Sequence, residues 1–152
     1  MGADRSAEPT LPVTFRPTRT RIVLLGVGAA MFATITAVAL LLERLTSGER
    51  ISFVFVAVLL SSVLVLLSRP KVVAEETGVT VVNLTTTRRL EWAQIVRVNL
   101  RPGDPWVFLD LNDGTSLPAL GIQPGVAKNQ AIADARALRA LAENRGTGSR
   151  ER

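Results

Sequence analysis

Two uncharged apolar runs constrain the fold of this chain more than any other feature. The first run, Ile22 to Leu42, has 21 residues, and the second, Ile51 to Leu67, has 17. An α-helix rises about 1.5 Å per residue, so the first run would span about 31 Å, and the second lies near the lower limit for crossing a bilayer. A buried core is the alternative, but the rest of the chain is too short to cover both runs. The runs therefore predict a transmembrane hairpin over residues 21–68, with helices at about 22–42 and 51–68.

Charges beside the two runs predict the orientation of the hairpin. The segment between the runs carries two Glu and two Arg, which cancel, whereas Arg19 and Arg21 precede the first run and Arg69 and Lys71 follow the second. Excess positive charge marks the cytoplasmic side of a membrane helix. We therefore expect a multi-pass protein of the plasma membrane with both termini in the cytoplasm. Residues 1–20 contain three prolines and mixed charge, which predicts a flexible cytoplasmic tail.

The end of the first run also resembles a signal-peptidase site, at Ala37-Val38-Ala39. Cleavage is the alternative to a membrane anchor here. However, three leucines, residues 40–42, continue the apolar run where a polar mature segment should begin, so the sequence favours the anchor.

Small residues recur on one side of the first predicted helix. Their spacing of i, i+4, i+7 and i+11 places them on one face, where a second backbone can approach closely. We expect this face to pack against the second helix near Ser61 and Ser62; self-association with another copy is the alternative. The residues are Gly26, Ala30, Ala33 and Ala37.

From Val72 onward the hydrophobic period changes to two, which predicts β-strands. Gly78 can supply a positive φ for a first hairpin turn, and Asp113-Gly114 is a strong signal for another. Trp92 opens a tight turn, "WAQI", and is expected in the core. The expected strands are Val72–Glu75, Val79–Leu84, Thr87–Glu91, 96–101, 106–112 and 115–122, part of about seven in all.

The last part of the chain has a helical period. Residues 125–146 carry an apolar stripe made of Ala131, Ala135, Leu138 and Ala142, with Ile132 and Leu141 beside it. The stripe can cover the inner faces of the strands. The sequence therefore predicts an α+β fold: a transmembrane helical hairpin, then a seven-stranded antiparallel barrel over residues 69–145, capped by the C-terminal helix, with 146–152 as a disordered tail.

Three motifs carry a resemblance to a known family: "GVTVVN" at 78–83, "RRLEWAQI" at 88–95 and "FLDLNDGTSLPALGI" at 108–122. Together with the two apolar runs and the final Ala/Arg/Leu helix, they resemble actinobacterial membrane proteins with a bacterial pleckstrin-homology (PH) domain of the low-molecular-weight protein antigen 6 type. The resemblance covers roughly residues 16–144. It implies a PH-like barrel of seven strands and a helix, in a family whose role is mostly uncharacterised, so it informs the fold more than the function.

The sequence offers one basic set and one aromatic pair as candidates for contact with a partner or a lipid. Many PH domains outside bacteria bind phosphoinositides through a basic first hairpin, but here that hairpin carries Glu75 and Glu76, which would repel a phosphate. Solvated strand faces are the alternative for the basic set, and cover by another segment is the alternative for the aromatic pair. The candidates are Arg88, Arg89, Arg97, Arg101, Trp106 and Phe108.

Composition and motif spacing argue against catalysis. The chain has no Cys and no His, which removes thiolate nucleophiles, imidazole bases and the usual zinc ligands. Gly26-Val27-Gly28 lies inside an apolar run without a preceding strand, so it is no dinucleotide motif. "DLNDG" at 110–114 lacks the spacing of a calcium loop. We expect no enzyme activity, no cofactor and no metal site.

Two functions remain from different classes. The first is a membrane-anchored cytoplasmic binding or scaffolding module, with an unknown protein partner and anionic lipid as a further ligand. The second is a structural subunit of a membrane assembly that acts through its transmembrane helices. The net charge of +5 does not favour nucleic acid, because no basic cluster is interleaved with aromatic residues on one face.

Overall fold

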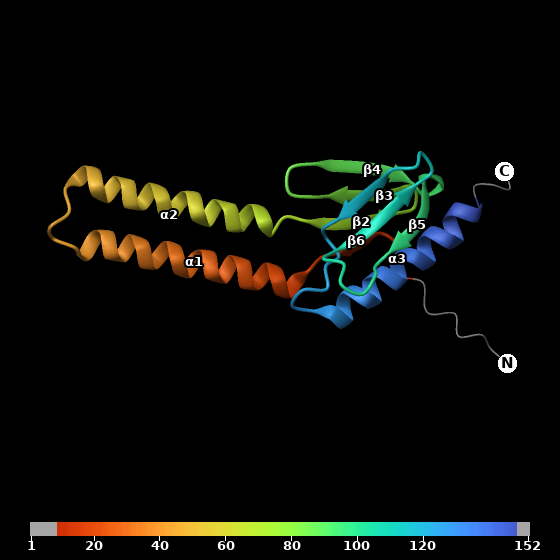
Figure 1. Cartoon of the computed structure of the whole chain (residues 1–152), viewed down its shortest axis with the longest axis horizontal. Helices are drawn as coiled ribbons and strands as arrows, with labels where there is room; N and C mark the ends of the chain where they lie inside the picture. The colour runs from red at the N-terminus through yellow and green to blue at the C-terminus, as the bar shows by residue number, and fades with distance from the viewer. Residues whose placement is uncertain (1–8, 149–152) are drawn as a thin grey trace. The chain divides into compact units, whose positions relative to one another are not determined.

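The computed structural model of the protein describes residues 9–148. Thr18–Arg69 form one compact unit, and the described residues on either side of that segment form the other. The first unit is a pair of helices. The second contains all seven strands of the described chain, a short 3₁₀-helix and the C-terminal helix (Figure 1).

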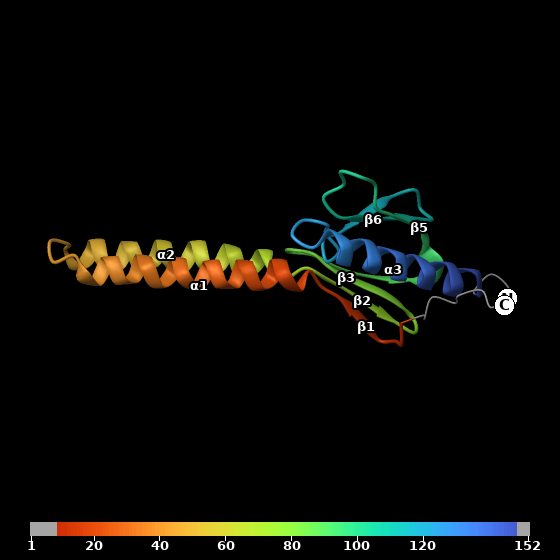
Figure 2. The same cartoon turned by 90° about the horizontal axis from the view of Figure 1, so that it is seen from below.

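The two helices are α1, Thr18–Leu41, and α2, Ser47–Leu67, and they run antiparallel side by side (Figures 1 and 2). Both are long and apolar enough to cross a membrane. Thr46 starts α2 with a capping box: its hydroxyl accepts the Glu49 N–H, and the Glu49 carboxylate accepts the Thr46 N–H at 2.8 Å. This reciprocal cap explains why α2 begins four residues before the apolar run itself.

The prediction of the helix–helix contact face is wrong. Gly26, Ala30, Ala33 and Ala37 are exposed, whereas Gly28 and Ala39 are buried against α2. The Ser61 hydroxyl donates a 3.2 Å hydrogen bond to the main-chain carbonyl of Gly28, so Ser61 does lie at the contact. The helices approach at two small residues of α1, Gly28 and Ala39, with the larger Met31 and Ile35 half-buried on the same side. Such a face buries more apolar area than a face of small residues would.

A four-stranded antiparallel sheet has the order β1-β2-β3-β4. Its strands are β1, Val13–Phe15; β2, Lys71–Glu75; β3, Gly78–Val82; and β4, Thr87–Glu91. Strand β1 precedes the apolar helices in sequence, yet Phe15 pairs with Val72 and is buried in the core. The prediction of a flexible tail through residue 20 is therefore wrong for residues 13–15, which form β1, and for residues 18–20, which belong to α1. Residues 1–8 of that tail lie outside the described part.

Gly78 is required for a different reason than the sequence suggested. Its φ is not positive; the glycines with positive φ in the described chain are Gly103 and Gly114. Instead, a Cβ built at Gly78 would lie 2.1 Å from the main-chain oxygen of Leu90 on the neighbouring strand. Gly114, with φ of 83°, does occupy the left-handed region at the predicted hairpin turn.

A three-stranded antiparallel sheet follows, in the order β5-β6-β7. The 3₁₀-helix η1, Trp92–Gln94, leads into β5, Ile95–Asn99; then come β6, Val107–Leu111, and β7, Ser116–Ala119. No strand pair in residues 9–148 joins the two sheets, so the predicted barrel is not closed. Six strands rather than seven follow the apolar helices. The turn of η1 redirects the chain between β4 and β5, and this interrupts the ladder.

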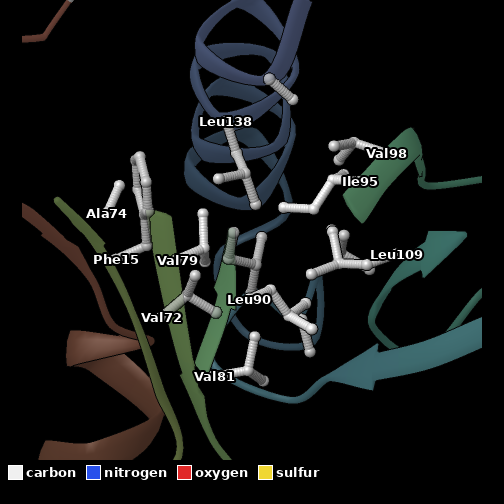
Figure 3. Close-up of a cluster of buried hydrophobic side chains, with 14 of the residues drawn as sticks. Phe15, Val72, Ala74, Val79, Val81, Leu90, Ile95, Val98, Leu109 and Leu138 are labelled. Carbon is white, nitrogen blue, oxygen red and sulfur yellow. The ribbon is translucent and has the colours of Figure 1, made fainter. Parts of the chain in front are cut away.

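Helix α3, Lys128–Gly148, packs against β5 and η1. Figure 3 shows Leu138 of α3 pointing between the sheets, with Val79 on one side and Ile95 on the other. The predicted apolar stripe is confirmed, because Ala131, Ala135, Leu138 and Ala142 are all buried. The helix continues two residues beyond the predicted end at Gly146, and residues 149–152 of the predicted tail lie outside the described part.

Polar contacts and one close approach hold the two sheets together. The Asn83 amide donates to the carbonyl of Pro118 at 2.9 Å and accepts the Leu120 N–H at 3.1 Å. A Cβ at Gly121 would lie within 2.5 Å of the Lys71 carbonyl carbon, so the chain after β7 passes directly over β2. Asn83 therefore satisfies main-chain groups at the corner where the sheets meet.

Candidate functional site

The six candidate contact residues do not converge on one site. Arg88 and Arg89 lie on β4, Arg97 lies on β5, and Arg101 follows β5 in a loop. Trp106 immediately precedes β6, and Phe108 lies within it. The basic set is thus divided between the two sheets.

Arg89 and the acidic hairpin neutralise each other. The Arg89 guanidinium lies 3.2 Å from the Glu75 carboxylate and also donates to the Thr77 hydroxyl at 3.1 Å. Glu76 at the same turn accepts from Arg145 of α3. These contacts leave the first hairpin without surplus positive charge.

Arg88 instead lies near Asp113 at the turn between β6 and β7. The pKa of Asp113 is lowered, first by the hydrogen bond from the Thr115 hydroxyl, then by that from the Thr115 N–H, and to a smaller extent by the charge of Arg88. The donor-to-Oδ1 distances are 2.6 Å for the hydroxyl and 2.8 Å for the N–H. Asp113 is therefore a turn-stabilising carboxylate, ionised at neutral pH.

The aromatic pair occupies the outer side of the three-stranded sheet. Val107, Leu109 and Leu111 are buried, as the alternation predicts, whereas Trp106 and Phe108 are half-buried. The two rings lie 6.4 Å apart between centroids, tilted by 51°. The indole N–H of Trp106 is buried and has no hydrogen-bond acceptor within residues 9–148.

Polar side chains share this outer side with Phe108. Asp110 accepts hydrogen bonds from the Asn99 amide and, at 2.9 Å, from the Ser116 hydroxyl. Arg97 lies opposite Asp110 in the register of β5 and β6. The outer side of this sheet is therefore a mixed polar and aromatic surface.

A groove of about 410 Å³ lies between α3 and the loop that follows β5; we call it the α3 groove. It is of a size that accommodates a small ligand or a few side chains of a partner. Its apolar lining consists of Leu100, Pro102, Pro124, Ile132 and Ala135, and its charged lining consists of Arg101, Asp104, Lys128, Arg136 and Arg139.

Arg139 has a structural contact at one end of this groove. Its guanidinium donates to the main-chain carbonyl of Val98 through Nε at 3.2 Å and through Nη2 at 2.9 Å. Val98 lies on β5, an edge strand of the three-stranded sheet. Arg139 therefore satisfies a main-chain acceptor of the edge strand and ties α3 to β5.

The sequence-based candidates included only Arg101 of the groove residues. Lys128 and Arg136 were missed, and Ile132 was assigned beside the core stripe, although it is half-buried and lines the groove. Lys128, Ile132 and Arg136 follow one another at four-residue spacing, which places them on one side of α3. That spacing was a usable signal, but the opposing loop could not be positioned from sequence.

Residues 9–148 contain no group of three His, Cys, Asp or Glu side chains that could hold a metal ion. The two antiparallel sheets and the C-terminal helix define a small α+β domain, preceded along the chain by two apolar helices.

Comparison with known proteins identifies the domain. Residues 69–141 match the family model of the bacterial PH domain. The chain therefore carries a bacterial PH domain over those residues, and the resemblance recognised from the sequence is confirmed. Strand β1 lies outside the matched segment, although it completes the first sheet.

Uncharacterised mycobacterial proteins are among the relatives. Proteins of Mycobacterium bovis and of two strains of Mycobacterium tuberculosis are each 28% identical to this chain over 95 residues. The aligned segment covers 62% of this chain and 61% of each relative, so the chain spans about three fifths of the length of these curated relatives. No solved structure matches the chain.

Proposed function

We propose that this protein is a membrane-anchored binding module whose two apolar helices hold the bacterial PH domain at the inner face of the plasma membrane. The observation that carries the proposal is that the same chain contains this domain and two helices whose apolar side chains are exposed. In the described part of the chain, the exposed large apolar side chains lie between residues 22 and 67, apart from Val96 and Val126. Lipid hydrocarbon would remove that surface from water.

The proposed orientation puts both termini and the PH domain in the cytoplasm. The arginines before α1 and the pair Arg69 and Lys71 after α2 support it, since the segment between the helices has no excess positive charge. An anchored domain meets a membrane-bound partner at high local concentration, so even a weak contact can be effective.

The proposed contact surface comprises Arg97, Arg101, Trp106 and Phe108. The two arginines are exposed, and the aromatic side chains, half-buried on the outer side of the sheet, add apolar area. Aromatic and arginine side chains of this kind are enriched among the residues that dominate binding energy. Anionic lipid is a further proposed ligand. On β4, Arg89 is paired with Glu75, whereas Arg88 is exposed and could contact a lipid headgroup.

A second function is supported by the helices themselves. The exposed small face of α1, made of Gly26, Ala30, Ala33 and Ala37, is not used in the contact with α2. Small faces allow close helix packing in membranes, so this face suits a helix of another subunit. In that case the protein is a structural subunit of a membrane assembly, and the PH domain has a structural role in that subunit.

Proximity labelling in the native host separates the two functions. A labelling enzyme fused after Arg152 would tag the neighbours of the unchanged protein and of two variants. Loss of a discrete set of neighbours when Arg97, Arg101, Trp106 and Phe108 are replaced by Ala supports the binding module. Loss only when Ala30 and Ala33 are replaced by Leu supports the assembly subunit, and neighbours that persist in both variants contradict both functions.

A further inference from the structure

The cations of the α3 groove are arranged along a line. Lys128 and Arg136 are eight residues apart on α3, which separates their backbones by about 12 Å along the helix axis. Ile132 lies midway between them, and Arg101 faces the same groove from the loop after β5. The lining is thus positive at both ends and apolar in the middle.

The positive charges of this groove outnumber the acidic ones in its lining. Arg101, Lys128 and Arg136 take part in neither of the two ion pairs found in residues 9–148. Asp104 is the single acidic residue of the lining, and its Oδ2 accepts the Arg101 N–H at 2.8 Å. The partner of Arg139 is the neutral main-chain carbonyl of Val98, not a carboxylate. The groove therefore favours an anionic ligand.

The start of α3 adds to this preference. The first turn of α3 contains no acidic residue, and Ala127, which precedes it, has no side-chain oxygen to accept the first N–H groups. The positive end of the helix dipole thus adjoins Lys128, and the first turn of α3 supplies no carboxylate to offset it.

The spacing of the charges decides which anion fits. A single phosphate, such as that of a lipid headgroup, is best held by cations that converge on one point. Here Lys128 and Arg136 are two helical turns apart, with Ile132 and Ala135 between them. An extended acidic peptide matches this pattern, because carboxylates four residues apart are about 13 Å apart and flank one intervening side chain on the same face.

We propose that the α3 groove binds an acidic segment of a partner protein, with an apolar side chain of that segment packed on Ile132 and Ala135 and carboxylates facing Lys128 and Arg136. This inference rests on the proposed function as a binding module and specifies the chemistry of the partner. Arg101 completes the site from the opposite side.

Binding of a labelled peptide to the full chain in zwitterionic nanodiscs tests the proposal. The probe has the core Glu-Ser-Leu-Ser-Glu, and fluorescence anisotropy gives its dissociation constant at low and high salt. The double change Lys128→Glu with Arg136→Glu should weaken binding about tenfold or more, since two attractive pairs become repulsive. The change Ile132→Ser, and a probe with Gln in place of Glu, should each weaken binding as well.

Matched variants guard against effects of net charge and of misfolding. Arg44→Glu with Arg50→Glu alters net charge equally outside the PH domain and should leave peptide binding unchanged. The double change Lys128→Arg with Arg136→Lys keeps both positive charges and should retain peptide binding. Circular dichroism spectra must agree among all variants that are compared.

Three results would overturn the inference: equal loss in the Arg44 and Arg50 variant, no loss in the Lys128 and Arg136 variant, or binding of anionic vesicles at these residues without binding of the peptide. The last result would assign the groove to lipid. None of these results decides the proposed function itself. Arg101 belongs to both surfaces, but Lys128 and Arg136, which carry the test of the groove, are unchanged in the proximity-labelling variant.

Discussion

The indole nitrogen of Trp92 donates a 3.0 Å hydrogen bond to the main-chain carbonyl of Glu75. Trp92 opens η1, where the chain passes from the first sheet to the second, and Glu75 ends β2. The ring is buried, as predicted, and the hydrogen bond satisfies its one polar atom. This contact ties the turn between the sheets to the first hairpin.

Replacing Trp92 with Phe should destabilise the PH domain by about 1–3 kcal/mol, because the carbonyl of Glu75 loses its donor and the smaller ring leaves space. Thermal unfolding of the full chain in detergent, followed by circular dichroism, measures the change. Trp106→Phe is the matched control, since the Trp106 N–H has no acceptor among the described residues. Equal effects of the two replacements would mean that the hydrogen bond contributes nothing.

Most of the domain could be predicted because apolar residues recur in its strands and its helix with the period of each element. The alternation of Val107, Leu109 and Leu111 and the stripe of α3 each identify a buried face without knowledge of the partner. Strand β1 could not be predicted, because its three residues have no period of their own and pair with a strand more than fifty residues further along the chain. The prediction that Gly78 has a positive φ failed for a similar reason: its constraint comes from Leu90 on another strand.

Candidate sites were harder to predict than elements. Arg97 and Arg101 were identified from their spacing. The sequence did not indicate that Arg89 forms an ion pair with Glu75, or that Arg101 lines a groove together with α3. Such groupings depend on how the loop after β5 lies against a helix some thirty residues later. Local sequence patterns do not indicate how such distant segments pack against each other.

Strand β1 gives a second prediction. Phe15→Ala should destabilise the PH domain by about 3–5 kcal/mol, because a buried ring of the core is lost. Thr14→Ala on the same strand should have an effect close to zero, since Thr14 is exposed. Thermal unfolding of both variants tests this, and a Phe15→Ala variant as stable as Thr14→Ala would show that β1 is dispensable for the domain.

The close approach at Gly78 gives a third prediction. Gly78→Ala should disrupt the pairing of β3 with β4, because the new methyl group would lie 2.1 Å from the Leu90 oxygen. Backbone must move to relieve this overlap. Gly125→Ala provides the comparison, as no heavy atom lies within 4 Å of a Cβ at that position. Amide hydrogen exchange in β3 and β4 should accelerate in the first variant and remain unchanged in the second; similar protection in both would rule out the steric constraint.

A fourth prediction concerns pH. The folded chain holds the pKa of Asp113 below its ordinary value, chiefly through the Thr115 hydroxyl, so Asp113 contributes stability above its unfolded pKa. That contribution is lost as the pH falls through the folded pKa. Thr115→Val should raise the pKa of Asp113, measured by NMR titration of its carboxyl carbon. Arg88→Gln should raise it less, because the charge of Arg88 is the smaller cause. The reverse order of the two shifts would refute this ranking.

The fifth prediction tests the membrane topology, and the absence of cysteine from the chain makes it direct. A single cysteine at Ser47, the exposed first residue of α2, should react with a membrane-impermeant maleimide in intact cells, because this end of the hairpin is proposed to lie outside. A single cysteine at Asn112, exposed at the turn between β6 and β7, should react only after the cells are opened. Both variants label equally in detergent if the chain is folded and accessible. Labelling of Asn112→Cys but not of Ser47→Cys in intact cells would invert the proposed orientation, and labelling of both would show that the helices do not form a transmembrane hairpin.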